Sequence, residues 1–144
     1  IHTSLTQETR HIINRDTLKL MKPTAILVNT SRGAVVDTKA LAVSLKNKQI
    51  EAAALDVTEV EPIDPDDMLL GLPNVMITPH LAGFSPQFLE ECPIRQAENI
   101  IRVLSGRAPH GLANPEVIKT IAVMRSTDPG RWANIPDFST ALSI

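Results

Sequence analysis

The sequence predicts an α/β fold in which a parallel sheet is flanked by helices. Three short apolar runs, at about residues 24–29, 51–57 and 74–78, alternate with helical patterns along the 144 residues. This alternation is typical of a parallel sheet. Each run is followed by a segment that supplies at least one ionisable side chain. Because open α/β sheets bind ligands at the carboxyl ends of their strands, we expect these side chains to form one site.

The first helix and the first strand are predicted from capping residues and apolar spacing. Residues 15–22 form a short helix, with Asn14 at its N-cap and Pro23 directly after its end. Residues 25–28 are then apolar without interruption. Such a run is typical of a parallel strand that is buried on both faces.

The second helix is predicted to follow the first strand closely. Asp37 is a suitable N-cap, and the amphipathic spacing continues to Asn47, with Lys46 near the negative end of the helix dipole. The second and third apolar runs follow this helix. An acidic, proline-rich loop separates them.

A long helix is predicted after the third strand. Ser85 and Pro86 are typical of an N-cap followed by proline at the first helical position, and the helix extends to about residue 105, with Gly106 at its end. Pro93 removes one backbone hydrogen bond inside this helix. Beyond it the proline and glycine content rises and the apolar periodicity fades, so we expect an extended tail over residues 109–144.

Composition favours a packed globular domain over several other classes of protein. Hydrophobic residues make up 43% of the chain, aromatic residues make up 3%, and the formal net charge is −2. This balance argues against a nucleic-acid partner. No apolar stretch approaches the roughly 18 residues of a membrane span. Cys92 is the only cysteine, which favours a reducing compartment and a cytoplasmic location. The histidines and the cysteine do not have the spacing of a metal site, and we expect no metal ion.

The chain lacks one feature that a complete dinucleotide-binding domain needs. It contains six glycines but no G-x-G-x-x-G turn between a strand and a helix, and it begins with Ile1. We therefore expect a part of a longer protein.

Three short segments at the expected edge of the sheet indicate a catalytic site. The chain reads VNTSRG at residues 28–33, LDVTEVEP at 55–62 and TPHLAG at 78–83. They supply an arginine, a carboxylate and a histidine. In order and spacing, these segments resemble the NAD-dependent D-isomer-specific 2-hydroxyacid dehydrogenases, and the resemblance extends from about His2 to about Pro115.

The resemblance implies a Rossmann-like NAD-binding domain, of which residues 1–108 form the C-terminal half. The glycine-rich half of that domain and the substrate domain are expected to be absent from these residues. The segment after Ser85 is most similar to the phosphoglycerate dehydrogenase, hydroxypyruvate reductase and glyoxylate reductase branches of the family. The implied cofactor is NAD, with NADP as the open alternative, and the implied substrate is a small 2-oxo or 2-hydroxy acid. A homodimer is expected by analogy with the family.

The implied reaction explains why these three residue types should converge. Arg32 would bind the substrate carboxylate, because guanidinium presents paired donors in one plane and stays charged. His80 would exchange a proton with the substrate oxygen, since a free histidine side chain titrates at a pKa of about 6.5. Glu61 would orient that imidazole. Glu59 lies in the same loop and is a competing carboxylate, but the family pattern favours the residue directly before Pro62.

The same resemblance implies which residues line the nicotinamide. These cofactor-binding candidates are Thr30, Ser31, Arg32, Asp56, His80, Ala82 and Gly83. Each residue also has a plain structural alternative. Arg32 could be a solvated surface arginine, His80 a core or capping histidine, and Asp56 a turn residue.

Two further hypotheses concern the whole chain. The first is a non-catalytic binding protein with the dehydrogenase fold, similar to the C-terminal-binding-protein corepressors. Those proteins usually have a tryptophan shortly after the histidine, where this chain has Gly83 and Phe84. The second is an inactive half-domain remnant. By itself, the 144-residue chain is expected to be inactive.

Overall fold

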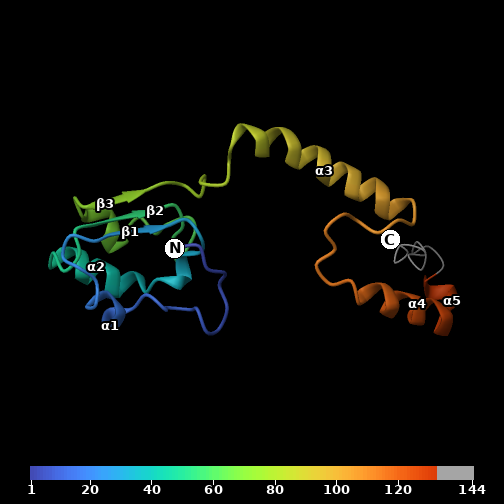
Figure 1. Ribbon diagram of the computed structural model, residues 1–144, viewed down its shortest axis with the longest axis horizontal. Helices are drawn as coiled ribbons and strands as arrows, with labels where there is room; N and C mark the ends of the chain where they lie inside the picture. Colours follow the sequence, from blue (N-terminus) through green and yellow to red (C-terminus); the bar gives the residue numbers. More distant parts are fainter. Residues whose placement is uncertain (133–144) are drawn as a thin grey trace. The chain divides into compact units, whose positions relative to one another are not determined.

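The structure, a computed structural model, describes residues 1–132 and divides into two compact units, Ile1–Phe84 and Ser85–Ile144 (Figure 1). The first unit contains the sheet and all three segments of the proposed site. The division falls after Phe84, earlier than residue 108, where we expect the partial cofactor domain to end. That domain border stays a prediction.

The first unit is built on a parallel sheet of three strands. These are β1 (Ile26–Asn29), β2 (Ala52–Leu55) and β3 (Val75–Ile77), in the order β1-β2-β3. The register pairs Ile26 with Ala52 and Ala53 with Val75. The predicted α/β class is therefore confirmed, and the carboxyl ends of the three strands meet at one edge.

Two helices and two short 3-10 turns complete this unit. The helices are α1 (Arg15–Leu18) and α2 (Thr38–Lys46), and the turns are η1 (Gly33–Val35) and η2 (Met68–Gly71). Asp37 caps α2 by accepting a hydrogen bond from the amide of Ala40 at 3.0 Å, as predicted. Helix α1 ends earlier than predicted, at Leu18, and Asn14 caps it in a capping box.

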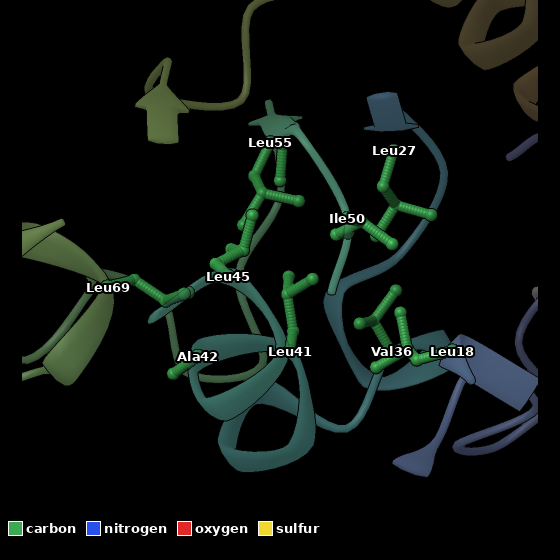
Figure 2. Packing of buried hydrophobic residues seen from close by; sticks show 10 residues of the cluster. Leu18, Leu27, Val36, Leu41, Ala42, Leu45, Ile50, Leu55 and Leu69 are labelled. Atoms are coloured by element: carbon green, nitrogen blue, oxygen red, sulfur yellow. The ribbon is translucent and has the colours of Figure 1, made fainter. Parts of the chain in front are cut away.

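The hydrophobic core lies on one face of the sheet. Figure 2 shows Leu27 of β1 and Leu55 of β2 directed toward Leu41 and Leu45 of α2. All four side chains are at most 5% exposed. This core holds the strands in place, and with them the loops that follow their carboxyl ends.

The expectation that the first strand is buried on both faces is wrong for this structure. Alternate residues of β1 are exposed: Ile26 and Val28 expose 62% and 48% of their surfaces. Met76 of β3 exposes 66%. Leu27 and Asn29 face the core instead. The reason is that the core cluster of the described chain packs against a single face of the sheet.

The second unit is helical. Helix α3 (Pro86–Leu104) begins as predicted, with the Ser85 hydroxyl accepting a hydrogen bond from the amide of Phe88 at 3.1 Å. Gly106 follows it with a φ of +79°, a conformation that favours glycine. No helix within residues 1–132 is long and apolar enough to cross a membrane.

The predicted extended tail is wrong over residues 117–132, where the chain is largely helical. The structure contains α4 (Val117–Thr127) and α5 (Pro129–Trp132), and Ile118 of α4 is buried. Val117, Ile118 and Ile121 give α4 apolar residues at helical spacing, and the surrounding prolines concealed this pattern. The last part of the predicted tail, residues 133–144, lies outside the described residues.

Candidate active site

A histidine and a carboxylate form the centre of the candidate site. Nδ1 of His80 lies 2.8 Å from Oε2 of Glu61, and the two side chains expose 49% and 41% of their surfaces. His80 follows β3, and Glu61 lies in the loop after β2. The two residues therefore come from neighbouring strands, and the contact leaves Nε2 as the ring nitrogen that can face a substrate.

The electrostatics of the site keep Glu61 ionised. The hydrogen bond from His80 lowers the pKa of Glu61, burial opposes this, and the Thr58 amide and the charges of His80 and Arg32 lower it further. Glu61 therefore acts as the acceptor, and Nδ1 of His80 carries the proton. Because the pKa of Glu61 is lowered by folding, the contact is present above the usual pKa of a glutamate and is lost as the pH falls through the lowered value.

Asp56 fixes the turn that carries His80. Its two carboxylate oxygens accept hydrogen bonds from the Thr78 hydroxyl at 2.6 Å and from the amides of Leu81 and Ala82, both at 2.8 Å. These contacts, led by the one from Thr78, outweigh burial and lower the pKa of Asp56. The amide of His80 also donates to the Asp56 carbonyl at 2.9 Å. Asp56 is therefore a turn residue, which is the structural alternative that the sequence left open. Its contact with a nicotinamide stays a prediction.

The turn holds His80 in an uncommon backbone conformation. Its φ is +55°, in the left-handed region that residues other than glycine seldom adopt. The hydrogen bonds to Asp56 on both sides of the residue stabilise this conformation. The direction of the His80 side chain is consequently set by the conformation of this turn, because the residue lies beyond the end of β3.

Asn29 plays the corresponding part in the loop that carries Arg32. It is fully buried, and its side-chain oxygen accepts hydrogen bonds from the amide of Ser31 at 3.1 Å and from the Ser31 hydroxyl at 2.9 Å. Its side-chain nitrogen donates to the Arg32 carbonyl at 3.0 Å. Sequence reasoning did not single out Asn29. A polar residue that ends an apolar run and precedes a serine was the available signal.

Arg32 itself is exposed at the same edge of the sheet. Its Nη1 donates to the carbonyl of Ser31 at 2.6 Å, and its charge contributes to the lowered pKa of Glu61. A hollow of about 400 Å³ is lined by residues 2–5 together with Ser31 and Arg32. The guanidinium is therefore accessible to an anion from solvent.

Two further hollows adjoin the turn at His80. One of about 400 Å³ is lined by Asp56, Glu61 and His80, among others. The other, of about 310 Å³, includes Thr30, Asp56 and Ala82 in its lining. Gly83 follows Ala82 and is exposed. The structure thus brings Asp56, Glu61 and His80 together at one hollow, whereas Ser31 and Arg32 line a separate one.

The two carboxylates of the loop after β2 have different partners. Glu59 lies 2.8 Å from Nε2 of His11 and 3.0 Å from Nη2 of Arg10. Glu61, and not Glu59, lies within hydrogen-bond distance of His80. Within residues 1–132, no group of three or more histidine, cysteine, aspartate or glutamate side chains could hold a metal ion.

Gly33 is the point at which the loop of Arg32 lies closest against the loop of Glu61. A Cβ atom at this position would lie 1.9 Å from the carbonyl oxygen of Thr58 and 2.4 Å from the amide nitrogen of Glu59. Both are backbone atoms, which cannot rotate away as a flexible side chain can. The sequence shows glycine here but not why, because Thr58 lies 25 positions further along the chain.

We expect Gly33→Ala to destabilise the protein by about 1–3 kcal/mol, the usual cost of forcing atoms into a packed contact. Thermal unfolding of the variant beside the unmodified protein would measure this. Gly71→Ala is the matched control, because a Cβ at Gly71 meets nothing within 4 Å. Equal unfolding temperatures for the two variants would show that Gly33 and Thr58 are not in contact.

The parallel sheet and the ionisable side chains at the carboxyl ends of its strands define an α/β domain of the ligand-binding class. The sequence model described as "D-isomer specific 2-hydroxyacid dehydrogenase, NAD binding domain" matches residues 1–82, which include all but the last residue of the three segments of the site. The chain belongs to the D-isomer-specific 2-hydroxyacid dehydrogenase family. The resemblance identified in the sequence is thereby confirmed.

Individual relatives agree with this assignment. The chain is 48% identical over 119 residues to a glyoxylate reductase of Aeropyrum pernix, an alignment that covers 83% of this chain and 36% of the relative. The solved TT0316 protein of Thermus thermophilus matches with a TM-score of 0.72 and 45% identity, covering 76% of this chain and 35% of that one. The chain therefore spans about a third of the length of the relatives it matches.

Solved neighbours differ in the cofactor that their descriptions name. D-lactate dehydrogenase of Lactobacillus jensenii, described with NAD+, has a TM-score of 0.67 and 32% identity, over 76% of this chain and 37% of that one. A D-isomer-specific 2-hydroxyacid dehydrogenase of Xanthobacter autotrophicus Py2, described with NADPH, has a TM-score of 0.62 and 37% identity, over 73% and 43%. The family is thus NAD-binding, and both forms of the cofactor occur among the neighbours.

Proposed function

We propose that this chain supplies the acid–base group and the carboxylate-binding group of an NAD(P)-dependent D-2-hydroxyacid dehydrogenase that reduces a small 2-oxo acid. The single observation that carries the proposal is the 2.8 Å contact between Nδ1 of His80 and Glu61. Glyoxylate and hydroxypyruvate are the first substrates to consider, because relatives named as reductases of these compounds match most of this chain.

In this proposal His80 moves the proton. Its Nδ1 is bound to the ionised Glu61, so Nε2 is the atom that donates a proton to the carbonyl oxygen of a 2-oxo acid during reduction. The same atom takes the proton back from the hydroxyl group during oxidation. Glu61 keeps the ring in one orientation and stabilises its positive charge before the proton leaves.

Arg32 binds the substrate carboxylate. Its guanidinium is exposed, and Asn29 and Ser31 hold the backbone beneath it. A planar fork of two N–H donors matches a carboxylate, and this binding would set the 2-oxo group in a fixed direction relative to Nε2 of His80.

The residues at the sheet edge fit a nicotinamide. The hollow of about 310 Å³ combines apolar walls from Val28, Met76 and Leu81 with polar groups of Thr30 and Asp56. A flat heteroaromatic ring with a polar substituent needs such a mixed surface. Thr30, Asp56 and Ala82 would hold this ring, with Ser31 and Gly83 beside them. The bound cofactor would supply the hydride that reduces the carbonyl carbon.

Turnover of 2-oxo acids by the full-length protein tests this proposal. The aligned 119 residues are 36% of the Aeropyrum relative, which is therefore about 330 residues long. Reduction of glyoxylate, hydroxypyruvate and pyruvate would be followed by the absorbance of NADH and of NADPH. Oxidation of the reduced cofactor that depends on a 2-oxo acid supports the proposal, and tight cofactor binding without turnover would favour the non-catalytic alternative. The predicted homodimer is measured separately, by light scattering.

A further inference from the structure

The loop that presents Glu61 is anchored by a second histidine–carboxylate pair. Glu59, two residues before Glu61, lies 2.8 Å from Nε2 of His11 and 3.0 Å from Nη2 of Arg10. The Glu59 side chain is 26% exposed and His11 is 35% exposed, so this contact is more buried than the one between Glu61 and His80. The sequence left Glu59 as a competitor for the catalytic carboxylate. The structure gives it a different partner.

His11 is itself fixed to the rest of the first unit. Its amide donates to the carbonyl of Ala34 at 2.9 Å, and its carbonyl accepts from the side chain of Asn14 at 3.0 Å. Its φ of +52° lies in the left-handed region, as that of His80 does. Ile13 continues the attachment through its amide, which donates to the carbonyl of Val35 at 3.1 Å. The backbone that carries the imidazole of His11 is therefore held in place by hydrogen bonds on both sides.

Apart from the approach of Gly33 to the backbone of Thr58 and Glu59, the loop has few other anchors near Glu61. Val57 is buried at its beginning, but Val60 is 67% exposed and Pro62 is exposed as well. Within the loop, Thr58 donates its amide to Oε1 of Glu61 at 3.1 Å and its hydroxyl to the Val60 carbonyl at 2.7 Å. These bonds make the turn compact but do not tie it to another segment. The Glu59 side chain ties the loop to the segment at residues 10–11 through His11 and Arg10, and it is also hydrogen-bonded by Thr38 at the start of α2.

We propose that Glu59, held by His11 and Arg10, is a positioning residue that keeps Glu61 at Nδ1 of His80. The inference rests on the proposed function, because it assigns a task to the loop of that same site. A partly exposed ion pair contributes little to the stability of the whole fold. Its main effect is therefore expected on the place of the loop, and through Glu61 on the orientation of the imidazole.

The test compares Glu59→Ala with Glu59→Gln in the full-length enzyme. Glu59→Ala removes the anchor and should lower kcat about 10-fold, less than the ~100-fold cost of a 1 Å misplacement at a reacting centre. The KM values for cofactor and 2-oxo acid should stay within about 2-fold, because neither binding group is touched. Glu59→Gln keeps an oxygen that accepts hydrogen bonds from His11 and Arg10 and should recover most of kcat. Asp16→Ala is the control. It breaks the 2.9 Å ion pair between Asp16 of α1 and Lys19, the residue that follows this helix.

A spectroscopic readout separates this proposal from the proposed function. Nitrogen NMR reports which ring nitrogen of neutral His80 carries the proton, and a bond to Glu61 keeps it on Nδ1. We expect Glu59→Ala, and also His11→Ala, to shift the proton toward Nε2, in the direction of a Glu61→Ala reference. This measurement needs no turnover, so it remains valid for a protein that reduces no 2-oxo acid.

Three results would overturn the proposal. The first is an unchanged His80 ring signal in Glu59→Ala. The second is a loss of kcat that Glu59→Gln does not recover. The third is a ring proton on Nε2 in the unmodified protein, because there would then be no contact for Glu59 to maintain.

Discussion

Replacing His80 should remove 2-oxo acid reduction and leave cofactor binding intact. The side chain is the proposed source of the proton through Nε2, while Nδ1 is bound to Glu61 at 2.8 Å. Loss of a general acid typically costs about 10²–10⁴-fold in rate, so we expect His80→Ala to lower kcat by at least about 100-fold. The kcat of the variant, and the Kd of NADH measured by its fluorescence, would check both parts of this prediction.

Two further variants protect this result from a folding artefact. His80 has a φ of +55°, which alanine tolerates less well than asparagine does. His80→Asn should therefore fold normally and still lose turnover, since an amide exchanges no proton near neutral pH. His110→Ala is the control of the same residue type, because His110 is exposed in the second unit. Turnover that survives in His80→Asn would exclude this residue as the acid.

Arg32→Lys should weaken the use of 2-oxo acids by about 100-fold in kcat/KM, which corresponds to about 2.7 kcal/mol of transition-state stabilisation. Lysine keeps the charge but offers a single compact donor group where arginine offers a planar fork. The carboxylate would still be attracted but no longer held in one direction. Steady-state kinetics with varied 2-oxo acid would measure the change.

The KM for the cofactor distinguishes loss of the fork from a general disturbance of the sheet edge. It should stay unchanged in Arg32→Lys, because Arg32 lines a hollow separate from the one proposed for the nicotinamide, although the resemblance also named it as a cofactor-binding candidate. Arg15→Lys, at an exposed position at the start of α1, should behave as the unmodified protein does. An Arg32→Lys enzyme with normal kcat/KM would show that Arg32 is a surface residue.

The elements that sequence reasoning placed well are those fixed by neighbouring residues. Asp37 and Ser85 cap their helices through side-chain contacts three positions along the chain, and a local pattern can reveal such contacts. The three strands are likewise short apolar runs between turn residues. The first helix of the tail, α4, was missed although its spacing is local, because the prolines and glycines around it dominated the pattern.

Burial was harder to predict than secondary structure. Residues 25–28 are all apolar, which favoured a strand covered on both faces, yet Ile26 and Val28 are exposed and Leu27 packs in the core. An apolar run does not reveal how many layers the surrounding chain supplies. That depends on elements such as α2, whose position on the sheet is a long-range property.

The sequence alone determined the fold class, the order of the helices and strands as far as α3, and the residue types of the candidate site, since periodicity, caps and motifs are encoded over a few positions. The resemblance to the family favoured Glu61 over Glu59, and the tertiary structure showed that the two carboxylates of this loop have different partners, His80 for Glu61 and His11 for Glu59. It also revealed why residue 33 must be glycine and why Asn29 is buried. These are contacts between segments that lie 19 to 48 positions apart or at buried turns, and no local pattern records them.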